Sequence, residues 1–152
     1  MHALLLAFPL IVAMGGVSVD SLSVSGEPFD VAAEWRDVPL REPLSANTGN
    51  PRLILYIRDL DGAGLDRDRV VKQLPWRFQK DSVEAEVFAR DGTAYPLRMT
   101  GYSFFRGMPG LVLEHPDIPR GVSFYRLRLR SRTPIPRAVM IWLDSLGRSR
   151  PE

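Results

Sequence analysis

The clearest pattern in the chain is an alternation of apolar and cationic side chains from Phe124 to Arg132. Tyr125, Leu127 and Leu129 fall on one side of this stretch. Four arginines fall on the other side: Arg126, Arg128, Arg130 and Arg132. Successive side chains of a β-strand point to opposite faces, so this period of two predicts a strand with one buried and one solvated face.

A second pair of alternating stretches, residues 83–90 and 95–99, flanks the dipeptide Asp91-Gly92. Asp-Gly between two such stretches predicts a β-hairpin with a type I′ turn, in which both central residues have positive φ. Pro96 lies in the second arm and cannot donate a backbone hydrogen bond. It therefore predicts that this arm is an edge strand.

Residues 53–57 and 138–143 are apolar on both faces, which predicts short central strands without a solvated side. Weaker alternation or short apolar runs predict four further strands, at residues 20–25, 29–36, 102–105 and 111–114.

The stretches between these strands contain many turn formers. Residues 37–51 hold Pro39, Pro43 and Pro51, so we expect an irregular surface connection there. Residues 70–78 are expected to begin as a helical turn and to end as a strand around Trp76 and Phe78. No convincing helix is expected after the N-terminal segment.

Together these stretches make about eight or nine strands at intervals of about 8–12 residues. The pattern predicts an all-β domain over residues 20–146, folded as an antiparallel β-sandwich, because two sheets can each bury one face. Alternation does not contain the strand order, so an immunoglobulin-like topology and a jelly roll are both left open. Residues 147–152 are expected to form a frayed tail.

The N-terminus begins with an apolar run over residues 3–16, interrupted only by Pro9. Its length favours residues 1–19 as a signal peptide or a membrane anchor, although no Lys or Arg precedes the run. A buried hydrophobic segment of a soluble domain is the alternative. The first two interpretations place the rest of the chain in the periplasm or at the cell surface.

The composition and net charge of the chain exclude several kinds of function. The chain is 45% hydrophobic and 25% charged, which is typical of a globular domain. A formal net charge of +2 gives no reason to expect nucleic-acid binding. The absence of cysteine excludes disulfides, zinc-thiolate sites, iron–sulfur clusters and cysteine nucleophiles. We expect no cofactor.

The arginines of residues 126–132 form the first candidate surface, because guanidinium groups bind phosphates, anionic lipid headgroups and acidic partners. A structural role competes with this hypothesis. Glu84 and Glu86 occupy the corresponding face of another predicted strand and could pair with the arginines across the sheet. Alternating charges also protect an edge strand from aggregation.

Residues 59–68 resemble a calcium loop only in part. Asp59, Asp61 and Gly64 match positions 1, 3 and 6 of the EF-hand loop, but Val70 stands where a bidentate glutamate is required. A weak candidate for a cation site consists of Asp59, Asp61, Asp66 and Asp68. Our default interpretation is a solvated loop without metal.

Aromatic residues give a further candidate surface. Phe104 and Phe105 are adjacent, so in a strand they must face opposite ways, and one of them could contact a partner or a membrane next to Met108. The three tryptophans are expected to lie in the core rather than on a carbohydrate-binding platform: Trp35, Trp76 and Trp142.

No catalytic constellation is visible in the sequence. His115 lies beside Asp117 in a proline-containing turn, and Ser103 lacks a nucleophile-elbow motif. We therefore expect a non-enzymatic, exported module that acts in binding or assembly as a subunit or accessory of a cell-envelope complex. The alternative is a small-ligand binder that holds a glycan or anionic lipid on its arginines.

Overall fold

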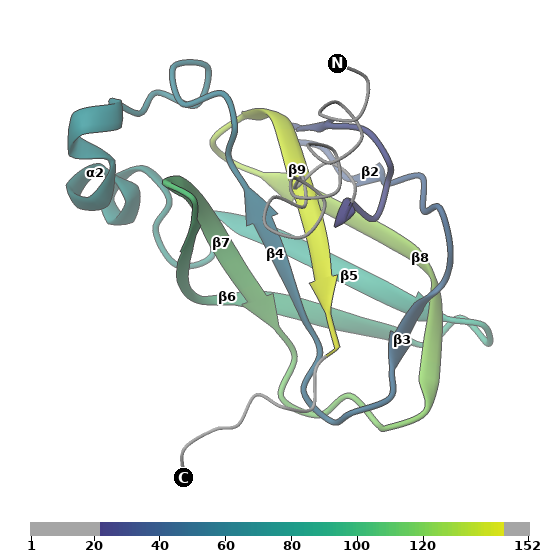
Figure 1. Cartoon of the computed structure of the whole chain (residues 1–152). Coiled ribbons are helices and arrows are strands. Elements are labelled where there is room, and N and C mark those ends of the chain that lie inside the picture. The colour runs from purple at the N-terminus through teal and green to yellow at the C-terminus, as the bar shows by residue number, and fades with distance from the viewer. Residues whose placement is uncertain (1–21, 145–152) are drawn as a thin grey trace, which may run out of the picture.

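The computed structural model in Figure 1 describes residues 22–144, which form nine strands and two short helical elements. The strands are β1 (Phe29–Val31), β2 (Arg36–Asp37), β3 (Leu44–Ala46), β4 (Arg52–Tyr56), β5 (Val83–Ala89), β6 (Ala94–Phe105), β7 (Met108–Glu114), β8 (Val122–Ser131) and β9 (Ile135–Leu143). The 3-10 helix η2 (Arg67–Arg69) and the helix α2 (Val70–Arg77) lie between β4 and β5.

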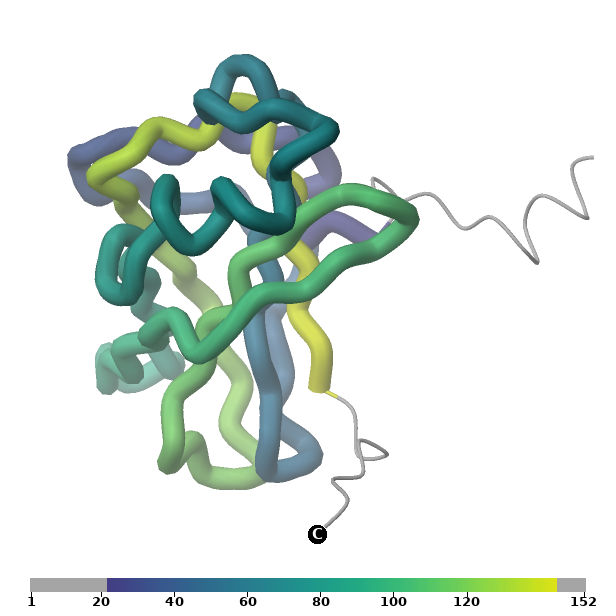
Figure 2. The backbone as a smooth tube through the Cα atoms, turned by 90° about the vertical axis from the view of Figure 1, so that its left-hand side faces the viewer, coloured from purple at the N-terminus to yellow at the C-terminus, as the bar shows by residue number. Residues whose placement is uncertain are grey.

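All strand pairs are antiparallel and belong to one sheet. The order is β1-β9-β4-β7-β6-β5-β8-β2, and β3 pairs with β8 further along that strand. The sheet curls into a nearly closed, barrel-like shape (Figures 1 and 2). The predicted all-β antiparallel class is thus confirmed.

A single curled sheet takes the place of the two sheets expected for a sandwich. Both architectures bury one face of each strand, so alternation alone could not separate them. The expected leader at residues 1–19 and the expected tail at residues 147–152 lie outside the described residues.

The N-terminal third closes the seam between the two edges of the sheet. Val24 N donates to Met140 O of β9, and Arg41 N donates to Val24 O, each at 2.9 Å. Ser131 N at the end of β8 donates to Ala32 O just after β1, at 2.7 Å. Residues 29–36 are accordingly interrupted between β1 and β2 instead of forming the single predicted strand.

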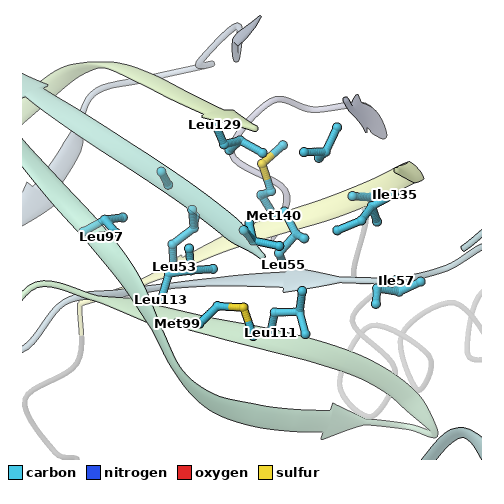
Figure 3. Close-up of a cluster of buried hydrophobic side chains, with 14 of the residues drawn as sticks. Leu53, Leu55, Ile57, Leu97, Met99, Leu111, Leu113, Leu129, Ile135 and Met140 are labelled. Carbon is cyan, nitrogen blue, oxygen red and sulfur yellow. The ribbon is translucent and has the colours of Figure 1, made fainter. Parts of the chain in front are cut away.

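The core lies inside the curl and draws one face from each long strand (Figure 3). It is dominated by leucines, and eight of them are at most 1% exposed: Leu53, Leu55, Leu74, Leu97, Leu111, Leu113, Leu127 and Leu129. The predicted two-faced strands at residues 53–57 and 138–143 appear as β4 and β9, which are hydrogen-bonded to each other.

The prediction of a strand around Trp76 is wrong, because residues 70–77 form α2. Asp66 Oδ1 accepts from Asp68 N at 3.0 Å and caps η2, which leads directly into α2. Val70 and Leu74, one helical turn apart, are buried against the core. Only these two positions face the core, so the helical period was too short to recognise in the sequence.

The hairpin around Asp91-Gly92 is confirmed, but its turn is not type I′. Ala89 N donates to Thr93 O, so three residues form the loop, and of these Gly92 has positive φ. This is a turn followed by a left-handed glycine, the usual three-residue hairpin. The two-residue turn with positive φ at both positions occurs instead between β6 and β7, at Arg106 (φ 54°) and Gly107 (φ 80°).

Pro96 does not mark an edge strand, because β6 lies between β5 and β7. Pairing of β6 with β7 begins only at Arg98, so at Pro96 the strand has a neighbour on the β5 side alone. The missing donor is therefore tolerated in an interior strand whose end extends past its second neighbour.

Asp144 fastens the seam through its carboxylate. It accepts hydrogen bonds from Ser45 Oγ, Asn47 N, Thr48 N and Thr48 Oγ1 at 2.8–3.1 Å. Trp142 Nε1 adds a 2.7 Å bond to Ser45 O. Partial burial would raise the pKa of Asp144, but the hydrogen bonds outweigh it and hold the pKa below the ordinary value of 3.8.

We predict that Asp144→Ala lowers the free energy of unfolding by about 1–3 kcal/mol, because it leaves several donors without their acceptor. A carboxyl whose folded pKa is depressed stabilises the protein above its unfolded pKa of about 3.9, and this contribution is lost as pH falls through the folded pKa. Urea unfolding of the unsubstituted chain and of Asp144→Ala, at pH 7 and at strongly acidic pH, measures the difference in their free energies of unfolding. A stability difference that does not shrink on acidification would contradict it.

Candidate interaction surfaces

The predicted arginines on β8 lie on the outside of the sheet and are paired with carboxylates. Arg128 meets Glu86 at 2.7 Å and Arg130 meets Glu84 at 2.7 Å, both on β5. Arg126 meets Asp37 of β2 at 3.0 Å. The strand register places Glu86 opposite Arg128 and Glu84 opposite Arg130, so these are direct cross-strand pairs.

Two aromatic rings complete this arginine face. Arg128 and Arg130 stack on Trp35, with guanidinium-to-ring distances of 4.4 and 4.5 Å. Arg126 lies 4.6 Å from the ring of Phe88. Trp35 was predicted to be core, but it is half-buried beneath these guanidinium groups. The cations, carboxylates and rings thus satisfy one another, as the alternative structural role requires.

The fourth arginine, Arg132, follows the end of β8 and is exposed. Its backbone N donates to Ser82 O at 2.9 Å, and its side chain lies outside the row of cross-strand pairs.

The Asp-rich loop at residues 59–68 is held by local hydrogen bonds. Asp59 Oδ1 accepts from Gly62 N at 2.9 Å, while Asp66 caps η2. Among residues 22–144, no group of three or more His, Cys, Asp or Glu side chains is arranged to hold a metal ion. His115 Nδ1 accepts from Asp117 N at 3.0 Å and the ring meets Tyr95 edge-on.

The β6–β7 hairpin carries the predicted aromatic residues. A bulge between Met99 and Gly101 shifts the register, so beyond it Tyr102 and Phe104 take the core side of the sheet. The hairpin extends past the core at this point, which leaves Phe104 45% exposed. Phe105 faces the opposite side of the sheet, because adjacent side chains of a strand point to opposite faces. It is half-buried.

Phe105 and Met108 pack against a second hydrophobic cluster on the outside of the sheet. We call its members the outer apolar face: Ile54 and Tyr56 of β4, Val112 of β7, and Val139 and Ile141 of β9. They alternate with the core residues of the same strands and therefore point away from the core. Each is nevertheless at most 8% exposed.

Tyr56 is the centre of this outer apolar face. Its ring lies over Gly110 on the neighbouring strand, where an added Cβ would come within 2.8 Å of the ring. Phe105 meets the same ring with the centroids 6.0 Å apart. The face is thus a packed layer of side chains on three adjacent strands.

The outer apolar face is not among the sites that the sequence predicts. The signal was present, because residues 53–57 and 138–143 were recognised as apolar on both faces. Which residues turn outward and which strands lie together depend on the strand order, which alternation does not give.

No family model, curated protein or solved structure matches this chain. Among residues 22–144, no helix has the length and apolar character to cross a membrane.

We predict that Arg128→Met lowers the free energy of unfolding by about 1–2 kcal/mol. It removes a partly buried ion pair and the contacts with Trp35 and Phe88 while keeping the length of the side chain. Arg132→Met is the matched control and should change the stability little. Urea unfolding measures both, and equal effects would show that the stacked pairs add nothing.

Proposed function

We propose that this chain is a non-enzymatic module that binds another protein through the outer apolar face. Its place would be outside the cytoplasm, as a subunit or accessory of a cell-envelope complex. Export is supported by the apolar run at residues 3–16, and the binding role is supported by the second hydrophobic cluster.

The outer apolar face carries the proposal for a physical reason. A barrel-like sheet buries its inner face and normally turns polar side chains outward. Here three adjacent strands carry isoleucine, valine and tyrosine on that side instead. These side chains are at most 8% exposed in the single chain, so a partner would have to displace their present cover. Obligate protein–protein interfaces are apolar and resemble a domain core that has been divided in two. Strands are already rigid, so binding through them loses little conformational entropy.

The arginine face is a weaker candidate. Asp37, Glu84 and Glu86 already pair with its guanidinium groups, so an anionic ligand would have to displace them. We therefore do not propose the glycan- or lipid-binding alternative at this face.

Photo-cross-linking of the full chain tests the proposal. Tyr56→p-benzoylphenylalanine places the probe in the outer apolar face, and Tyr125→p-benzoylphenylalanine is a control on β8, where Tyr125 is 44% exposed. We expect irradiation of native membranes to give one stoichiometric adduct with a second protein from the Tyr56 probe alone. An apolar contact predicts that the yield does not fall as salt rises.

Two outcomes would contradict the proposal. The first is an adduct that maps to residues 3–16 of the same chain, because that segment is the other apolar cover the sequence offers. The second is an equal adduct from both probes, which would indicate nonspecific capture. Val139 is fully buried, so Val139→Lys serves as a second check only where circular dichroism shows that the variant keeps its fold; the folded variant should lose the specific adduct.

A further inference from the structure

The helix α2 turns an apolar arc to solvent. With 3.6 residues per turn, buried Val70 and Leu74 fall on one side. The opposite arc is exposed and consists of Val71, Lys72, Pro75 and Trp76. Trp76 is 80% exposed and Val71 67%. A surface helix normally shows polar residues to water, so an outward arc with three apolar members out of four needs an explanation.

Further exposed aromatic residues adjoin the end of α2. Tyr102 Oη donates to Phe78 O, the residue after the helix, at 2.8 Å. Tyr102 and Phe104 share the same side of the β6–β7 hairpin and are 40% and 45% exposed. Figure 1 shows α2 near this hairpin, at a corner of the molecule.

The charge around this corner is mixed, with a small excess of cations. Residues 69–80 contain four basic side chains and no acidic one, and Asp68 and Asp81 flank them. The basic residues are Arg69, Lys72, Arg77 and Lys80. Lys80, Arg98 and Glu114 line the same surface hollow as Tyr102, and Arg98 lies 3.8 Å from Asp81. Lys72 and Lys80 are therefore the cations that this corner offers to a partner.

We propose that this corner docks on an anionic lipid bilayer, with Trp76 and Val71 at the level of the headgroups. Tryptophan favours this interfacial region, because its ring is apolar and its N–H remains hydrated. Lysine can lay its stem along apolar surface while its ammonium group meets lipid phosphates. The site is separate from the outer apolar face and does not depend on the proposed protein partner.

A bilayer fits this surface better than a protein partner does. Protein interfaces place tryptophan in the middle of a complementary patch, enclosed by other contacts. Trp76 is instead 80% exposed. It belongs to α2, a short helix at a corner of the molecule (Figure 1), where a planar bilayer can reach it without a matching pocket.

Site-specific fluorescence in the full chain tests the proposal, and the absence of native cysteine makes single labels possible. Val71→Cys carries a polarity-sensitive dye on α2, and Ala94→Cys carries it beside the distant β5–β6 turn. With vesicles of phosphatidylcholine and phosphatidylglycerol, we expect a blue shift of the emission at position 71 and none at position 94. The shift should weaken in pure phosphatidylcholine.

Substitutions on the arc provide the second measurement. Lys72→Gln should require about fivefold more anionic vesicles for the half-maximal shift at position 71, because one cation near the surface is lost. Trp76→Glu should remove the shift, and Arg132→Gln is a control without effect. No shift at position 71, equal shifts at both labels, or a shift without vesicles as protein concentration rises would overturn the proposal.

Discussion

Strand β4 is hydrogen-bonded between β7 and β9, and all three strands are apolar on both faces. Their inward-facing side chains form the middle of the core. A shift of register that buried the outward-facing apolar side chains would therefore remove the inward-facing ones from the core. Every other element accommodates this constraint. The sheet curls around the inner face, while the end of the β6–β7 hairpin packs Phe105 and Met108 on the outer face.

The curl leaves two edges, and polar contacts rather than a further strand pair join them. Trp142 and Asp144 follow one another closely at the end of β9 and reach the segment around Ser45 and Thr48. Residues almost a hundred positions apart in the chain are thereby connected. Unpaired strand edges promote aggregation, because they can pair with other chains. The contacts of Trp142 and Asp144 therefore stabilise the fold and also oppose aggregation.

The sequence predicted what depends on neighbouring residues. The β8 alternation from Arg126 onward, the Asp91-Gly92 hairpin and the two-faced strands β4 and β9 are local patterns, and each is present. Tyr125 was expected on the buried side with Leu127 but is exposed, because an irregularity in the β5–β8 register places Phe124 in the core instead. The pairing of Glu84 and Glu86 with arginines was foreseen as an alternative because both strands alternate. The curled sheet, the place of Pro96 and the exposure of Trp76 depend on which strands lie together, and a single sequence does not contain that information.

The distribution of cations supports separate roles for the two basic surfaces. The planar guanidinium group of arginine can donate to a carboxylate at its edge and stack on an aromatic ring with its face. Three arginines of β8 make both kinds of contact. Only two of the twenty basic residues are lysines, Lys72 and Lys80, and both lie close to Trp76 in the chain. Both ammonium groups are exposed, and no ion pair holds them within residues 22–144. The arginines are therefore committed to the fold, whereas the lysines are free to meet a charged surface beside an exposed tryptophan.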